Sequence, residues 1–470
     1  MISRLPYELL SSILEEAACL NAREIQHYTY GVDTTSTKGK VQRTLRGRVA
    51  NDSLRWLSTD AIRQVNAQWH DWACQYALRD LYIRRWRGSE RWTQSRKLDT
   101  IQGYPSKDVY YRDPYCSLRK TVALFMNHPS LASSVRRIFF DGFYGIETTA
   151  MIFQVLKLCD ELDSVALPWI TLRYGTDKDW AHLLRRRDNG TVLSSLELLA
   201  VDLKQAQIRD HTRQVDNHPL DSDSVNFGHL RRMKLSGSSN LMPINDDDLV
   251  AVSRTARLQE LHITGTTSIT TKGLVALGRA SEATLRVLEH SPLSDDGFEH
   301  PNASSTGDGS HLCNEIVQCP HLGDLAVSLP TICTDLFSDG SVNWIGDVKI
   351  RAAGVCGQHS RLERSKDARQ AFFDILCHAR GLIEAQQKRQ IDLNIEIYIN
   401  HFIFEPSKQL VHADLSIAEI LSDGSWPVMA MPSSKGPYGQ TGQYGKDERA
   451  YQCILEEEFL EGLHKGYISF

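Results

Sequence analysis

Histidines and cysteines are the residues of this chain that could hold a metal or act as nucleophiles, and their spacing matches neither role. The 17 histidines form no HExxH pair, and the 10 cysteines occur singly without a CxxC pair. The sequence also has no Walker-type phosphate loop, no G-x-S-x-G turn and no G-x-G-x-x-G turn, and the glycines of residues 435–445 have the wrong spacing for one. We therefore expect a protein that is not an enzyme, with no metal and no cofactor.

Arginines alternate with Trp86 and Trp92 between residues 84 and 97. Such a composition can bind single-stranded nucleic acid, because bases stack on aromatic rings and phosphates pair with arginine. The whole chain, however, has a net charge of −5 and a pI of about 6.4. This balance favours a solvated end of a helical region with the tryptophans packed inward, and no nucleic-acid partner is expected.

The chain has 470 residues, more than one compact core usually serves, so we expect several domains or one elongated array. No apolar run approaches the ~18 residues that cross a bilayer. Residues 1–20 are interrupted by Arg4, Glu8, Glu15 and Glu16, which is unlike a secretory signal. The sequence thus predicts no membrane association, reduced cysteines and a cytoplasmic or nuclear location.

Helical spacing dominates the first part of the chain. Leu9, Ile13 and Leu20 fall on one face of a predicted helix that begins near Pro6. Polar residues then predict a loop over about 21–55, and a second helical pattern runs from Ile62 to Leu81.

An internal repeat is the strongest signal of the middle region. Its pattern is apolar-x-x-apolar-x-apolar, and successive copies begin 23 to 37 residues apart. The copies begin at Val135, Leu162, Leu196, Leu230, Leu258, Leu285, Leu322 and Ile345. Helical patterns at 149–159, 247–255 and 271–280 separate several copies. Short strands with returning helices must bury their apolar faces jointly by stacking, so the pattern favours a solenoid; an irregular α/β domain is the alternative.

The region after residue 357 is less repetitive. Its pattern predicts a long amphipathic helix over 365–387, a strand over 393–399 and a closing helix over 448–464.

The opening Leu5-Pro6-Tyr7-Glu8-Leu9-Leu10-Ser11-Ser12-Ile13 resembles the start of an F-box, and Val65 to Trp69 resembles its later Val-x-x-x-Trp segment. The repeats resemble leucine-rich repeats, notably the cysteine-containing kind found in F-box proteins. Two departures stand out. The 21–55 insertion is longer than the family usually carries, and the Asn or Cys expected just past each strand is missing, so the turns must find other hydrogen bonds.

The resemblance implies an α/β fold in which a small all-helical F-box domain precedes an irregular leucine-rich-repeat solenoid, a horseshoe of short parallel strands and helices. The predicted domains are an F-box-like region at 1–87, a connector at 88–130, the solenoid at 131–400 and a C-terminal capping segment at 401–470.

The function implied by the resemblance is that of a substrate receptor of an SCF-type cullin–RING ubiquitin ligase, in the ubiquitin-like conjugation pathway. The F-box would dock a Skp-type adaptor, and the concave repeat face would bind an unknown client protein. The alternative is a leucine-rich-repeat scaffold with a degenerate F-box and no ligase role. The predicted adaptor-binding residues are Leu5, Pro6, Leu9, Ile13, Val65 and Trp69.

Client-binding residues follow from the strand pattern, because side chains between and after the core positions point to the opposite face. Their charges are of mixed sign, which favours a protein partner read by local complementarity. They are Phe139, Asp141, Asp202, Lys234, Ser236, His262, Thr264, Glu289, Ser291, Lys349 and Arg351.

Overall fold

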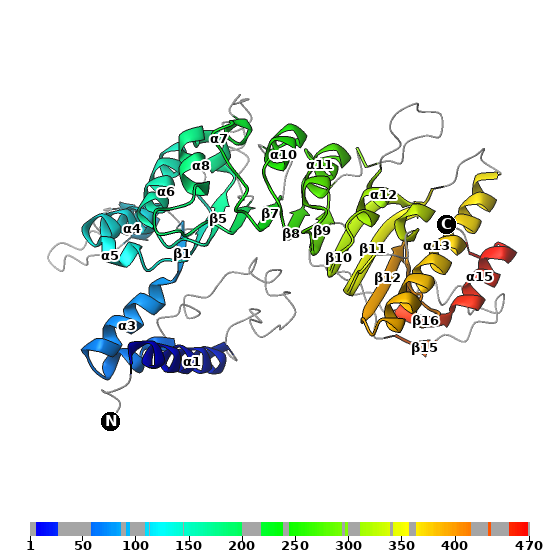
Figure 1. Cartoon of the computed structure of the whole chain (residues 1–470), viewed down its shortest axis with the longest axis horizontal. Helices are drawn as coiled ribbons and strands as arrows, with labels where there is room; N and C mark the ends of the chain where they lie inside the picture. The colour runs from blue at the N-terminus through cyan, green and yellow to red at the C-terminus, as the bar shows by residue number, and fades with distance from the viewer. Residues whose placement is uncertain are drawn as a thin grey trace, which may run out of the picture. The chain divides into compact units, whose positions relative to one another are not determined.

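The structure is a computed structural model of the whole chain (Figure 1). The residues it describes are 6–26, 58–85, 91–94, 109–111, 113–143, 145–199, 218–237, 244–293, 297–298, 311–338, 342–356, 363–414, 431–433 and 451–468. The chain is mixed α/β and divides into two compact units, residues 1–175 with 185–193 and residues 176–184 with 194–470. Each unit is considered by itself.

The first unit begins with a helical pair. Helix α1 (Tyr7–Gln26) packs against η4 (Ile62–Gln64) and α3 (Ala67–Leu78). The Asn66 side chain accepts a hydrogen bond from the Trp69 backbone N–H at 2.9 Å and so caps the start of α3. Helix α1 continues to Gln26, so the polar segment predicted to begin at residue 21 begins later.

The rest of the first unit is α/β. Strands β1 (Asp80–Arg84), β4 (Arg137–Asp141) and β5 (Ser164–Pro168) pair in parallel. Strand β1 lies inside the range 1–87 that the sequence predicts to be all helical, so that prediction is wrong for these residues. The predicted connector contains further elements: β2 (Arg91–Gln94), β3 (Val109–Tyr111), α4 (Cys116–Asn127) and α5 (Pro129–Ala132). Helices α6 (Ile146–Leu158) and α7 (Ile170–Tyr174) complete this unit.

Parallel strands in sequence order form the sheet of the second unit. They are β6 (Ser195–Leu199), β7 (Arg232–Ser236), β8 (Glu260–Thr264), β9 (Val287–Ser291), β10 (Asp324–Ile332), β11 (Gly346–Val355) and β12 (Leu393–Ile399). Helix α8 (Asp177–Leu184) precedes β6, and the elements between the strands include η5 (Pro219–Asp221), α10 (Asp246–Ser253), α11 (Thr271–Ser281), α12 (Leu312–Val317), η6 (Thr334–Phe337) and α13 (Glu363–Lys388). Figure 1 shows α10 and α11 side by side above strands β7 to β9, as repeated strand–helix units require.

A recurring backbone contact holds these strands in register. In front of each of the strands β6 to β9, one carbonyl accepts hydrogen bonds from two consecutive N–H groups of the next strand segment. Arg231 O, for example, accepts from the N–H groups of Gln259 at 2.7 Å and Glu260 at 3.0 Å. Ser194 O, Gln259 O and Arg286 O do the same for the segments that follow them. The turns after the strands are joined similarly, with Gly237 N–H bonded to Thr264 O at 2.7 Å. At these turns, backbone groups therefore supply the hydrogen bonds that the sequence leaves without an Asn or Cys side chain.

The predicted apolar pattern matches the buried core with two corrections. Strand pairing aligns Leu196 with Met233 and Leu198 with Leu235, so the third copy begins at Leu193 and not at Leu196. In the eighth copy the first position, Ile345, is 48% exposed, and the fully buried side chain is its neighbour Trp344.

Antiparallel strands close the second unit. Strands β13 (Phe402–Glu405), β14 (Leu410–Asp414), β16 (Tyr451–Leu455) and β15 (Met431–Pro432) follow β12 in the sheet, and α15 (Glu456–Lys465) ends the described chain. The predicted helix at 365–387 and strand at 393–399 are confirmed by α13 and β12. The predicted closing helix over 448–464 is too long, because residues 451–455 are a strand.

Candidate functional site

Helix α1 has two apolar stripes, and one of them is buried. Leu10, Leu14 and Ala18 recur every four residues and pack on Ile62, Trp72 and the neighbouring side chains of α3. The Trp72 indole N–H donates to Ser11 Oγ at 2.8 Å, which satisfies the polar atom of a buried ring. This stripe fixes the orientation of α1 on α3.

The second stripe of α1 is exposed. Leu9 and Ile13 are 55% and 53% exposed, and Val65, on the loop between η4 and α3, is 56% exposed. Pro6 is exposed as well, whereas Trp69 is half-buried against the helical core. Leu5 lies outside the described residues. Three large aliphatic side chains therefore face solvent on the helical pair that the sequence singles out.

Phe139 and Asp141 lie on β4 of the first unit, on the same face of the sheet. Phe139 stacks on Tyr82 of β1, with ring centroids 5.0 Å apart. The Tyr82 hydroxyl donates to Asp141 Oδ2 at 3.0 Å. Both predicted client residues are thus half-buried and held by the neighbouring strand.

Two rows of side chains cross the sheet of the second unit on the face opposite its buried apolar positions. We call them together the polar sheet face. The middle row, in pairing order, is Glu197, Lys234, His262, Glu289, Ala326, Lys349 and Glu396. The outer row is Leu199, Ser236, Thr264, Ser291, Ser328, Arg351 and Tyr398. The predicted client residues of the second unit, Asp202 apart, all lie in these rows. Asp202 rests on the misaligned third copy and lies outside the described residues; Glu197 and Leu199 take its place.

Charged groups of the polar sheet face are paired with one another across strands. Arg232, just in front of the middle row, donates from Nε and Nη2 to both oxygens of Glu260, at 2.5 and 2.6 Å. His262 lies between two carboxylates, with Nδ1 3.0 Å from Glu289 and Nε2 3.7 Å from Glu260. Burial disfavours the charged form of Glu260, but the nearby His262 ring and the hydrogen bonds from Arg232 outweigh it and lower the pKa of Glu260 to about 2. This carboxylate therefore stays ionised across the physiological range.

Lys234 is the more enclosed of the two lysines in the middle row. Its exposed fraction is 7%, and burial lowers the pKa of its ammonium to about 8, although Glu197 opposes the shift. Thr264 and Arg351 of the outer row are also buried, while Ser236, Ser291 and Lys349 are half-buried. The face is thus packed more closely than the fully solvated concave surface that the strand pattern suggests.

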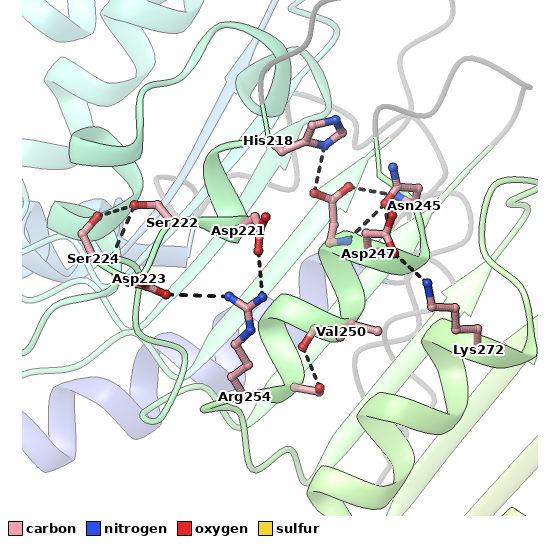
Figure 2. A network of polar contacts seen from close by, with 12 residues as sticks. His218, Asp221, Ser222, Asp223, Ser224, Asn245, Asp247, Val250, Arg254 and Lys272 are labelled. Carbon is pink, nitrogen blue, oxygen red and sulfur yellow. Dashed lines mark hydrogen bonds and ion pairs between the residues drawn. The ribbon is translucent and has the colours of Figure 1, made fainter.

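A separate network lies on the helical side of the second unit, around α10 (Figure 2). Asn245 and Asp248 form a capping box at the start of α10, and His218 Nδ1 is 3.1 Å from Asp248 Oδ1. Lys272 of α11 pairs with Asp247 at 2.7 Å, and Arg254 reaches Asp221 at 3.1 Å and Asp223 at 3.7 Å. The ion pairs join neighbouring elements. The pair of His218 with Asp248 supports the cap of α10 and connects this helix to the start of η5.

Histidine and cysteine side chains meet near the start of α12. His311, Cys313 and Cys333 bring one ligand atom each to within 4.8 Å of one another. Sequence reasoning missed this group because His311 and Cys333 are 22 residues apart and no metal motif spans them.

No family model matches the chain, and no curated protein sequence matches it significantly. Among the residues the structure describes, no helix is long and apolar enough to cross a membrane.

Proposed function

We propose that the chain is the substrate-recognition subunit of an SCF-type cullin–RING ubiquitin ligase. In this proposal the exposed stripe of α1 docks a Skp-type adaptor, and the polar sheet face binds a client protein. Ubiquitin transfer is then carried out by partner subunits, and this chain needs no catalytic residues of its own.

The exposed stripe of α1 is the observation that carries the proposal. A helix that served only to pack inside its own domain needs one apolar stripe, and Leu10, Leu14 and Ala18 already supply it. Leu9 and Ile13, one turn apart on α1, are each more than half exposed, as is Val65, and adjacent exposed aliphatic side chains such as the first two mark interaction surfaces. Residues of this kind supply the central anchors that dominate binding energy in an interface.

The second unit supplies a surface suited to a protein client. Its strands repeat in sequence order with helices between them, which supports the leucine-rich-repeat interpretation. The polar sheet face carries both signs of charge in fixed positions, including Lys234, Glu289 and Lys349. Alternating charge of this kind favours a folded or extended protein partner over a polyanion.

Adaptor binding is tested with the full chain, a purified Skp-type adaptor and the double variant Leu9→Ala, Ile13→Ala. Losing about 1.5 kcal/mol of apolar burial at each position weakens binding by about 3 kcal/mol, or on the order of 100-fold. The matched control is Leu124→Ala, Ile146→Ala, since these side chains of α4 and α6 are similarly exposed in the same unit. Binding that the first variant loses and the control keeps supports the proposal.

A folded wild-type chain that fails to bind the adaptor contradicts the ligase role. The interaction scaffold with a degenerate F-box is then the better account, because the sheet of the second unit is independent of the α1 surface. Equal binding by both double variants contradicts the assignment of the interface to α1.

A further inference from the structure

The group formed by His311, Cys313 and Cys333 lies in the second unit, where α12, β10 and η6 meet. His311 immediately precedes α12, and Cys313 lies in its first turn. Cys333 follows the end of β10 and precedes η6, which carries Asp335. The chain thus brings an imidazole, two thiols and a carboxylate together from two separate segments.

The distances within this group match those between the ligands of one tetrahedral metal ion. His311 Nε2 is 3.1 Å from Cys333 Sγ and 3.5 Å from Asp335 Oδ2. Bond lengths of ~2.3 Å to sulfur and ~2.0 Å to nitrogen or oxygen place tetrahedral ligands ~3.3 to 3.8 Å apart. Cys313 Sγ lies within 4.8 Å of both a His311 ring nitrogen and Cys333 Sγ, so side-chain rotation brings these three atoms into tetrahedral positions, and Asp335 completes the site by turning toward them from beside His311.

The burial of this group distinguishes it from a chance cluster of surface side chains. Cys313 is fully buried, and the His311 side chain is only 12% exposed. Cys333 hydrogen-bonds Cys313, so the two sulfur atoms face one another inside the group. Asp335 is half exposed, so the group opens to solvent on the carboxylate side and an ion has a path of entry.

We propose that His311, Cys313, Cys333 and Asp335 bind a zinc ion that fastens the start of α12 to the end of β10. Two thiolates, one imidazole and one carboxylate in tetrahedral positions form a donor set that suits zinc, whereas calcium and magnesium require oxygen ligands. Because all four positions are filled by protein groups, the site is structural. It does not depend on adaptor binding by α1.

Cys356 is a further thiol beside the group. It directly follows β11, and its backbone N–H donates to Ile332 O at 2.8 Å, beside Cys333. The proposal assigns the fourth position to Asp335 because its carboxylate already faces His311. A Cys356→Ser variant therefore keeps zinc, whereas Asp335→Asn weakens its binding.

The test measures the metal content of the full chain, purified under reducing conditions, by inductively coupled plasma mass spectrometry. Wild-type protein is expected to hold about one zinc ion per chain, and its cobalt-substituted form to show a thiolate-to-cobalt charge-transfer band. Cys333→Ser should weaken zinc affinity on the order of 100-fold in a chelator competition. The matched control is Cys453→Ser, which removes a buried thiol of β16 in the same unit.

Because Cys313 is fully buried, its substitution disturbs folding the most. Variants of the half-buried Cys333 and the exposed Asp335 therefore decide whether the group binds zinc. Absence of zinc and of the cobalt band from the folded wild-type chain overturns the proposal. Retention of full affinity by Cys333→Ser, iron in place of zinc, or a Cys313–Cys333 disulfide that persists in reducing buffer overturns it equally.

Discussion

His290 gives the sharpest prediction for the stability of the second unit. It occupies the last core position of the sixth repeat copy, on β9, and its side chain is 0% exposed. Its ring packs against Phe298, with centroids 4.6 Å apart. Burial lowers the pKa of His290 to about 3, so the imidazole is neutral in the folded protein at pH 5 and above.

The consequence follows from linkage between protonation and folding. An unfolded histidine has a pKa of ~6.5, so the unfolded chain takes up a proton that the folded chain refuses. The stability contributed by neutral His290 is fully present above pH ~6.5 and is lost as pH falls, by about 1.4 kcal/mol per pH unit. Between pH 7.5 and pH 5 the free energy of unfolding drops by about 2 kcal/mol on this account.

This contribution is measured by urea unfolding of wild type and His290→Leu at pH 7.5 and pH 5, followed by circular dichroism. The difference in free energy of unfolding between the two proteins isolates His290, because the other titrating groups are the same in both. We expect His290→Leu to gain about 2 kcal/mol relative to wild type on going to pH 5. Exposed His464, at the end of α15, supplies the control His464→Gln, which should follow the wild type. A difference between wild type and His290→Leu that does not change with pH refutes the reasoning.

Three further substitutions in the second unit test other contacts by the same unfolding assay. Gly265→Ala should cost about 2 kcal/mol or more, since φ is +67° there and an added Cβ would lie 2.2 Å from Gly237 O; an unchanged midpoint contradicts the close approach of the two turns. Asn245→Ala removes the cap of α10 and should cost about 1 kcal/mol, with faster amide exchange confined to that helix. Lys234→Met should raise the free energy of unfolding at pH 7 by about 2 kcal/mol, because the folded state lowers the pKa of this ammonium. The gain should shrink as pH rises from about 8 to 10, and a less stable variant at pH 7 rules the explanation out.

Strand positions could be predicted from the sequence because the apolar pattern is set by what each strand must bury. The predicted first positions match the buried core apart from Leu196 and Ile345, and the failure at Leu196 has a local cause. Residues 193, 196, 198 and 199 are all leucine, so two alignments satisfy the same pattern. Only the neighbouring strand decides between them, by placing Leu198 opposite Leu235.

Features that depend on contacts between distant segments could not be predicted. The apolar residues at 451–455 are compatible with a helix as well as with a strand. Their pairing with β14 determines that they form a strand. The half-buried state of the middle row depends on side chains of adjacent strands, which the pattern of one strand does not contain. The meeting of His311 with Cys333 likewise depends on how α12 returns to β10.

The two candidate surfaces differ in how their side chains are satisfied, and this difference bears on what each can bind. Leu9 and Ile13 gain nothing from exposure to water, so covering them is favourable without rearrangement. On the polar sheet face, Glu260 and Glu289 already have partners in His262 and Arg232, and a client must match this arrangement or replace these bonds. Net affinity from such pairs is small, whereas a wrongly placed charge is costly. Under the proposed function, the α1 surface would supply affinity for the adaptor, and the polar sheet face would supply selection among clients.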